Sequence, residues 1–314
     1  MLGRPKAPAD AHAGVRVMTY SSFMNAWGPG PEIAKRFREE TGIAVEFSDA
    51  GDAGLILEKM KLFPVDAVVG LDGLSLADAK SRHQWRELPV LEGEPGASFR
   101  DALFIAVDYA PVAFVYRDGE IDPPTSLENL TDARFKGKIA LEDPRTSTPG
   151  LQFFFWVLSS MGEEKGFQYL EALKQNLHSV SPSWSSAYGS FTKNQSALAF
   201  SYQTSPLYHV LEEKNESYRA ALFPTGHPLQ VEYAGVPEAC GRCTDGEKFV
   251  RFLQKREIQA LIMRKNFMLP VDEAAKEGTP FADLASVKVL KLENASELMA
   301  KRSDLFERWR ALGL

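Results

Sequence analysis

The sequence predicts an α/β protein with two lobes, each built on a mostly parallel sheet flanked by helices, and a ligand cleft between them. Short apolar strands alternate with amphipathic helices, an order that favours parallel sheets covered by helices. The chain has 314 residues, enough for two lobes of roughly 100–150 residues each. A late strand at 227–237 would return the chain to the first lobe, and two such crossings place a cleft, a favoured ligand site, between the lobes.

The first lobe begins with strand–helix–strand order. We expect a strand at 15–22, a helix at 31–42, a strand at 43–50, a helix at 54–63 and a buried strand at 65–73. The first helix opens with proline, places Ile33 and Phe37 four residues apart and closes with Gly42, as capped helices do. Ligands bind beyond the carboxyl ends of parallel strands, so the polar residues that follow these strands should line one edge of the cleft.

The second lobe is expected to start near the middle of the chain. Residues 103–119 predict two strands with a break at Ala110-Pro111. The later elements are strands at 196–202 and 218–224, the returning strand and one long helical segment at 244–266. The predicted limits are therefore 15–111 and 230–314 for a discontinuous first lobe and 112–229 for the second lobe.

Composition and charge disfavour several classes of protein. The chain is 44% hydrophobic and 25% charged, which is ordinary for a globular protein. Its net charge is −6, and it has no basic stripe, so we expect no nucleic-acid partner. The longest apolar run, near 151–158, is far shorter than the ~20 residues of a membrane span. Residues 1–14 hold an A-x-A pattern at Ala11–Ala13 without an apolar core, which predicts an extension or a signal-peptide remnant.

The two cysteines, Cys240 and Cys243, lie in one glycine-containing turn. Such a pair is compatible with a redox centre or half of a zinc site, but there is no second pair and the five histidines lack zinc-finger spacing. We favour a structural role, either as a small loop disulfide or as two free thiols. A disulfide would fit an oxidising compartment.

Residues 142–156 predict a helix whose N-terminus follows a strand end. Thr148 can cap this helix, with Pro149 at its first position. Ser147, Thr148 and the free backbone N–H groups would face the cleft, where a helix N-terminus receives anions, and Arg145 could add positive charge. Ordinary helix capping explains the same pattern about equally well.

Five aromatic residues stand among serines and threonines in loops and at strand ends, which is unusual for core aromatics. They are Tyr20, Trp27, Trp184, Tyr202 and Tyr208. An aromatic face attracts a cation by about 0.5–2 kcal/mol. Stacking on a flat heterocycle adds roughly 1–3 kcal/mol per face. If these rings converge on the cleft, they predict a flat, cationic ligand, although two or three of them could be core or surface aromatics.

Catalytic motifs are weak in this sequence. It has no G-x-S-x-G, no P-loop and no G-x-G-x-x-G. Several carboxylates lie near predicted strand ends, but their spacing names no acid/base pair. We expect most of them to hold backbone N–H groups; they are Asp66, Asp72, Asp108, Glu142 and Asp143.

Together these motifs resemble those of the thiamine-binding proteins of bacterial ABC importers, within the type II periplasmic binding-protein fold. The matching stretches are TYSSFMNAWGPGP, DAVVGLDG, DYAPVAFVYRD, EDPRTSTPGL, SWSSAYGSF and SYQTSPLYHVLEEKNESYRAALFPTGHPLQVE. The resemblance covers about residues 15 to 270. It implies two lobes, each a mixed, mostly parallel sheet flanked by helices, that close over thiamine, thiamine monophosphate or thiamine diphosphate. It also implies a monomer in the periplasm that delivers the ligand to an ABC permease of the inner membrane, with no cofactor and no enzymatic activity.

The resemblance also implies roles for individual residues. The five aromatic residues match the family's pocket, Asp52 matches an acidic position near the pyrimidine end, and Ser147, beside Thr148, matches a polar contact near the phosphate end. Ser21 departs from the family, which usually has aspartate there, and this change would favour a phosphorylated thiamine or another ligand. Phe267 stands where the family tends to have tryptophan, and a phenyl ring is a weaker partner for a cation.

Other functions stay open at this point. The nearest is the binding of a different cationic heterocycle, given the change at Ser21. Thiaminase-like enzymes resemble the same fold but use a cysteine nucleophile in the cleft, whereas the cysteines here follow the return crossover. A ferric-ion binder would use paired tyrosines, as Tyr202 and Tyr208 could be, but their tryptophan-rich surroundings are unusual for a metal site.

Overall fold

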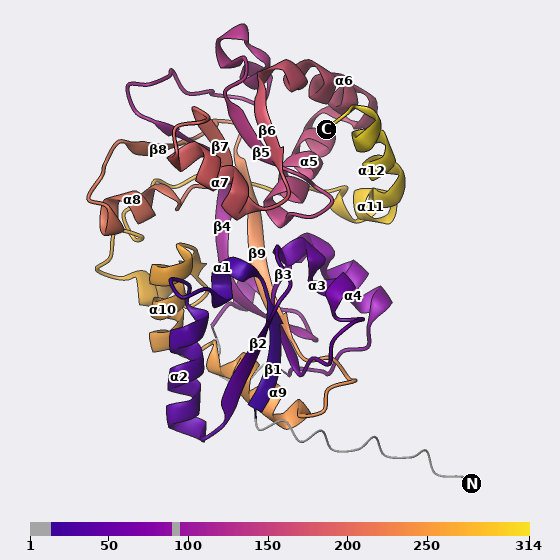
Figure 1. The fold of residues 1–314 in the computed structure, drawn as a ribbon, viewed down its shortest axis with the longest axis vertical. Helices are drawn as coiled ribbons and strands as arrows, with labels where there is room; N and C mark the ends of the chain where they lie inside the picture. The colour runs from indigo at the N-terminus through magenta and orange to yellow at the C-terminus, as the bar shows by residue number, and fades with distance from the viewer. Residues whose placement is uncertain (1–13, 90–94) are drawn as a thin grey trace.

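The computed structural model describes residues 14–89 and 95–314. The predicted extension or signal-peptide remnant therefore lies outside the described residues, apart from Gly14, which begins β1. Two lobes lie one above the other in Figure 1, and the long strands β4 (Phe104–Arg117) and β9 (His227–Gly235) run from one to the other. The fold predicted from the sequence is confirmed: it is a mixed α/β architecture of two lobes.

The first lobe is built on the parallel strands expected from its strand–helix–strand order. Strand β1 lies between β2 and β3 and pairs in parallel with both. The elements of this lobe are β1 (Gly14–Thr19), β2 (Ala44–Asp49), β3 (Ala67–Asp72), β10 (Leu269–Pro270), α1 (Ser21–Met24), α2 (Gly30–Thr41), α3 (Ile56–Lys59), α4 (Leu76–Arg82), α9 (Cys243–Phe252) and α10 (Arg256–Asn266). Short 3-10 turns are η1 (Ala53–Leu55), η2 (Gly73–Ser75), η3 (Ala97–Phe99) and η7 (Glu273–Lys276).

The second lobe repeats the pattern with a mixed sheet. Strand β5 pairs in parallel with β6 and β7, whereas β7 and β8 run antiparallel to β4. Its elements are β5 (Ile139–Glu142), β6 (Leu177–Ser181), β7 (Leu198–Tyr202), β8 (Tyr218–Ala221), α5 (Thr148–Met161), α6 (Glu163–Leu173), α7 (Trp184–Thr192), α8 (Pro206–Glu212), η4 (Glu128–Thr131), η5 (Ala133–Phe135) and η6 (Lys174–Asn176). The chain ends with β11 (Val289–Leu290), α11 (Ala295–Ala300) and α12 (Arg302–Ala311).

Strand β4 is continuous through Ala110-Pro111, so the predicted break into two strands is wrong. The strand changes partner there instead. It pairs with β9 as far as Pro111 and with β7 from Val112 onward. Proline is tolerated at this junction because the N–H that it lacks lies where pairing with β9 ends and pairing with β7 begins. Its carbonyl still accepts the backbone N–H of Gln203, at 2.9 Å.

Two further expectations change. The segment 244–266 forms two helices, α9 and α10, because the backbone of Lys255 between them is extended (φ −64°, ψ 136°) and interrupts the helix. The last two helices, expected in the first lobe, pack against the core of the second: Trp309 is fully buried and lies 5.3 Å from the ring of Phe154 on α5. We therefore propose that the second lobe includes the chain from β11 onward.

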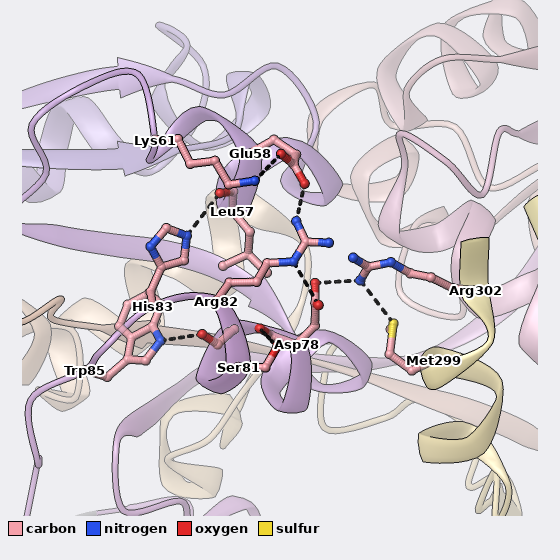
Figure 2. A network of polar contacts seen from close by, with 11 residues as sticks. Leu57, Glu58, Lys61, Asp78, Ser81, Arg82, His83, Trp85, Met299 and Arg302 are labelled. Atoms are coloured by element: carbon pink, nitrogen blue, oxygen red, sulfur yellow. Dashed lines mark hydrogen bonds and ion pairs between the residues drawn. The ribbon is translucent and has the colours of Figure 1, made fainter.

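A polar network also joins the lobes away from the crossing strands. In Figure 2, Arg302 of α12 reaches toward Asp78 of α4. The two side chains form an ion pair at 2.5 Å, and Asp78 also accepts a bond from Arg82 at 2.8 Å. Arg82 in turn pairs with Glu58 of α3. The C-terminal helices thus contact the first lobe through charge pairs as well as carrying part of the second lobe's core.

Candidate functional site

A cavity of about 820 Å³ lies between the lobes, within the usual size range of small-molecule sites. Its lining comes from α1, η1 and α10 of the first lobe and from α5, α7 and α8 of the second. The predicted site residues that line it are Tyr20, Ser21, Trp27, Asp52, Thr148, Trp184, Tyr202, Tyr208 and Phe267. Ser147, the remaining one, is the buried N-cap residue of α5, directly beside the lining.

Aromatic rings from both lobes face this cavity. Trp184 stacks on Tyr188 with ring centroids 5.1 Å apart and planes 15° apart, and its indole N–H donates to Ser201 at 2.8 Å. Tyr208 of α8 meets Phe267, just beyond α10, edge to face at 5.3 Å. The second of these contacts joins α8 to the residue that follows α10, so both lobes contribute rings to the aromatic wall.

Tyr20 and Trp27 lie at different depths. The side chain of Tyr20 is 7% exposed, whereas that of Trp27 is 54% exposed. An indole that exposed, next to a cavity, keeps a face available for a ligand. Tyr20 therefore belongs to the floor of the cavity and Trp27 to its mouth.

Asp52 occupies the N-terminus of α5, where the sequence predicted an anion, and also that of α7. Its carboxylate accepts the backbone N–H of Thr148 at 3.2 Å and that of Trp184 at 3.1 Å, at the starts of α5 and α7. Asp52 belongs to the first lobe and both donors to the second, so this one carboxylate links the lobes. The expected cap is also shifted by one position, since Ser147 is the N-cap residue and Thr148 the first residue of the helix.

The positive charge expected from Arg145 is also taken. Its guanidinium group holds Asp143 through several hydrogen bonds, with Nη2 2.5 Å from Oδ2. The predicted anion site at the start of α5 is therefore occupied by the protein's own Asp52 carboxylate. Arg145 does not add positive charge there, because it pairs with Asp143.

Ser21 has a carboxylate beside it despite its departure from the family. Its hydroxyl donates to Asp49 at the end of β2, with oxygen–oxygen distances of 2.7 and 2.9 Å. The family's aspartate at position 21 is thus replaced by a serine that is hydrogen-bonded to the carboxylate of Asp49.

Sequence reasoning missed Glu232 and Asn266, which also line the cavity. The Tyr20 hydroxyl donates to Glu232 at 2.6 Å, and the Asn266 amide donates to the Tyr20 oxygen and to Asp108, both at 2.8 Å. Glu232 is 5% exposed, on the buried strand β9. A signal existed, because strand alternation puts Gln230 and Glu232 on one face of an otherwise apolar stretch.

Four carboxyl groups with raised pKa values are buried in the described chain: Glu232 lines the cavity, whereas Asp72, Asp108 and Glu142 do not. Burial raises the pKa of Asp72 to about 6 and raises the pKa values of the other three, with the charge of Asp108 adding to the effect on Glu232. Within residues 14–89 and 95–314, no lysine or arginine forms an ion pair with any of them. Such groups favour the neutral form unless a ligand supplies positive charge.

The expected role of the strand-end carboxylates is confirmed for three of them. Asp66 accepts the backbone N–H groups of Gly241 and Arg242, Asp72 accepts that of Leu74, and Asp143 accepts that of Arg145. Asp108 instead accepts the side-chain amide of Asn266.

Cys240 and Cys243 form a disulfide at the start of α9, and neither lines the cavity. The thiol nucleophile that a thiaminase-like enzyme needs is therefore not in the cleft. In the described part of the chain, no group of three or more histidine, cysteine, aspartate or glutamate side chains could hold a metal ion. No helix among the described residues is both long enough and apolar enough to cross a membrane.

Comparison with known proteins agrees with this site. Residues 91–297 match the family described as "Bacterial extracellular solute-binding protein". The chain belongs to this family. It is therefore a binding protein rather than an enzyme.

Two similar proteins from different bacteria carry the same name. The "Thiamine-binding periplasmic protein" of Escherichia coli (strain K12) is 35% identical over 313 residues, which is 97% of this chain and 94% of that protein. The protein of the same name from Brucella abortus biovar 1 (strain 9-941) is 34% identical over 276 residues, 85% of this chain and 82% of that protein.

Solved structures support the same fold. A structure titled "Periplasmic thiamin binding protein" is 32% identical, has a TM-score of 0.89 and covers 98% of this chain and 99% of that one. A ferric binding protein from Campylobacter jejuni, 17% identical with a TM-score of 0.78 over 93% of this chain and 98% of that one, shares the fold alone.

Proposed function

We propose that this solute-binding protein captures thiamine, or a thiamine phosphate, in the cavity between its lobes and delivers it to an ABC permease of the inner membrane. The observation that carries the proposal is the pairing of aromatic walls with a carboxylate floor that has no cationic partner in the described residues. Thiamine has a flat pyrimidine ring and a permanently cationic thiazolium ring. The names of the similar proteins support the same ligand.

Binding would proceed by closure of the lobes over the rings. The stacked pair of Trp184 and Tyr188 offers a rigid aromatic face from the second lobe, and Phe267 comes from the first. Each such face contributes roughly 1–3 kcal/mol to a stacked ring. Three or four faces could therefore supply much of the about 12 kcal/mol that a nanomolar complex needs, less the ordering costs. Closure also forms the Asp52 link to α5 and α7, which gives the permease a shape to recognise.

We infer a periplasmic location for this activity. The disulfide of Cys240 and Cys243 fits an oxidising compartment, and the similar proteins are named as periplasmic. Export to the periplasm and action as a monomer are parts of the proposal.

The first test is a tryptophan fluorescence titration with thiamine, its monophosphate and its diphosphate in parallel. Saturable quenching is expected because Trp27 and Trp184 line the cavity. Choline, a cation without a flat ring, serves as the control and should bind much more weakly than thiamine, because it gains the cation–π contact but no ring stacking. A flat response to all three thiamine compounds, confirmed by calorimetry without binding heat, would reject thiamine and turn the search to other cationic heterocycles.

A further inference from the structure

We propose that Glu232 recognises the positive charge of the ligand, and that the ligand-free protein holds a proton at this carboxyl group which the cation displaces. The identity of the ligand rests on the proposed function above. Displacement of the proton depends on the carboxyl group of Glu232, and it does not follow from the fold or from the aromatic side chains of the cavity.

The position of Glu232 fits this role. It lines the cavity, yet it is 5% exposed, so a bound ring would complete its separation from water. One carboxylate oxygen accepts the Tyr20 hydroxyl at 2.6 Å and the other faces the amide of Gln230 at 3.3 Å. These neutral donors orient the group without neutralising it. A carboxylate held this way, at the edge of an aromatic cavity, is a suitable counter-ion for a cationic ring.

A chain of hydrogen bonds connects Glu232 to a second carboxyl group. Asn266 has two amide hydrogens, and it donates one to Tyr20 and one to Asp108, both at 2.8 Å. Tyr20 accepts from Asn266 and donates to Glu232, so its hydroxyl is fully used. Glu232 and Asp108 therefore share one network without a cation inside it, and the network is more stable when it carries a proton.

The charged groups that act most strongly on Glu232 in the described part of the chain are three carboxylates. Asp108 of β4, Asp72 of β3 and Asp52 of η1 all raise its pKa, in addition to burial. The Tyr20 hydrogen bond acts in the opposite direction. The basic residues lining the cavity, Arg264 and Lys265, are exposed in the last turn of α10 and form no ion pair with Glu232. The neighbouring charges thus favour the protonated acid until a cation arrives.

In the binding step, the cationic ligand replaces the proton on Glu232, so the net charge of the site does not change. The cation enters, the Glu232 O–H bond breaks, the proton leaves to solvent and the carboxylate stays beside the bound ring. Because the ligand-free group binds the proton and the complex does not, affinity rises with pH. The limit is about tenfold per pH unit below the pKa of the ligand-free carboxyl group, and the dependence disappears above that pKa.

Calorimetry in buffers of different ionisation enthalpy tests this directly. Below the pKa of the ligand-free carboxyl group, wild-type protein should release up to one proton per thiamine bound, and its Kd should tighten as the pH rises toward that pKa. Glu232→Gln should release no proton and lose the pH dependence. Its affinity should be at least about tenfold weaker than wild type at the high-pH end and close to wild type at the low-pH end.

Matched variants and a neutral ligand sharpen the result. Glu142→Gln removes a buried carboxyl group outside the cavity lining and should leave proton release unchanged. Asp108→Asn removes a neighbouring charge and should move the pH profile to lower pH, which keeps the test available if Glu232→Gln does not fold. A thiamine analogue with a thiophene in place of the thiazolium should bind wild-type protein without proton release.

The outcomes separate the two proposals. Binding of thiamine to wild-type protein without proton release overturns the role of Glu232 and leaves the proposed function standing. Loss of proton release in Glu142→Gln also overturns it, because the proton then belongs to another carboxyl group. If no thiamine compound binds at any pH, both proposals fall.

Discussion

Trp184 offers the sharpest test of the aromatic wall. Replacing it with alanine keeps its backbone N–H bond to Asp52 but removes the ring that stacks on Tyr188. The loss combines one stacking face, roughly 1–3 kcal/mol, with a cation–π contact of about 1 kcal/mol. Binding should therefore weaken by about 2–4 kcal/mol, which is roughly 30- to 700-fold in Kd. Trp184→Phe keeps a ring and loses one hydrogen bond to Ser201, so it should cost only about 1 kcal/mol.

Isothermal titration with thiamine measures both variants. Trp156→Phe is the matched control, because Trp156 is 1% exposed in the core of the second lobe and does not line the cavity. That variant is expected to lose stability while keeping the wild-type Kd. Equal Kd values for wild type and Trp184→Ala would refute the stacking argument, whatever the melting temperatures show.

Three further changes test the frame around the site. Asp66→Asn should lower the free energy of unfolding by about 3–5 kcal/mol in urea titrations, since Asp66 is fully buried against Arg16. The pKa of Asp66 is lowered in the folded protein, so the charge-dependent part of this contribution is present above about pH 4 and should be lost as the pH falls through the folded-state pKa. Reducing the disulfide, whose cysteines are 3 residues apart, should cost about 2 kcal/mol in thermal melts without changing Kd. Arg302→Gln breaks a partly exposed ion pair between the lobes, with Asp78. X-ray scattering of the ligand-free protein should therefore show a larger radius of gyration. Calorimetry should show a Kd weakened by less than about fivefold.

The fold was largely predictable because its signals are local. Alternating strands, the capped helix at Gly42 and the return crossover each lie in one short stretch of sequence. The failures involve contacts between distant segments. Nothing near Pro111 shows that its strand passes from one partner to another, and nothing near Trp309 shows that its ring fits beside Phe154, 155 positions earlier in the chain.

The site residues likewise fall into those that local sequence predicts and those whose role depends on distant segments. Its aromatic residues were found because tyrosine and tryptophan stand out among serines and threonines, and the resemblance then gave them a common pocket. Glu232 was missed because its meaning depends on Tyr20, Asn266 and Asp108, which come from three other elements. Asp52 was assigned to the ligand alone, whereas its bonds to α5 and α7 exist only once the two lobes meet.

The phosphate end of the ligand gives a last prediction. Asp52 fills the start of α5, and the floor is acidic, so a phosphate group would be repelled from both. The basic residues lining the cavity in the described chain are Arg264 and Lys265, at its exposed edge. A phosphate ester should therefore place its tail at the mouth, where attraction is screened by salt.

Lys265→Ala should weaken thiamine monophosphate binding by about threefold to fivefold at low ionic strength, the size of an exposed ion pair, and leave thiamine binding unchanged. Lys248→Ala on α9, outside the cavity lining, is the control and should affect neither ligand. Titrations of both ligands at two salt concentrations measure the difference. If Ser147→Ala instead weakens the monophosphate selectively while Lys265→Ala does not, the phosphate sits at the start of α5, and Asp52 must move away from that helix when the ester binds.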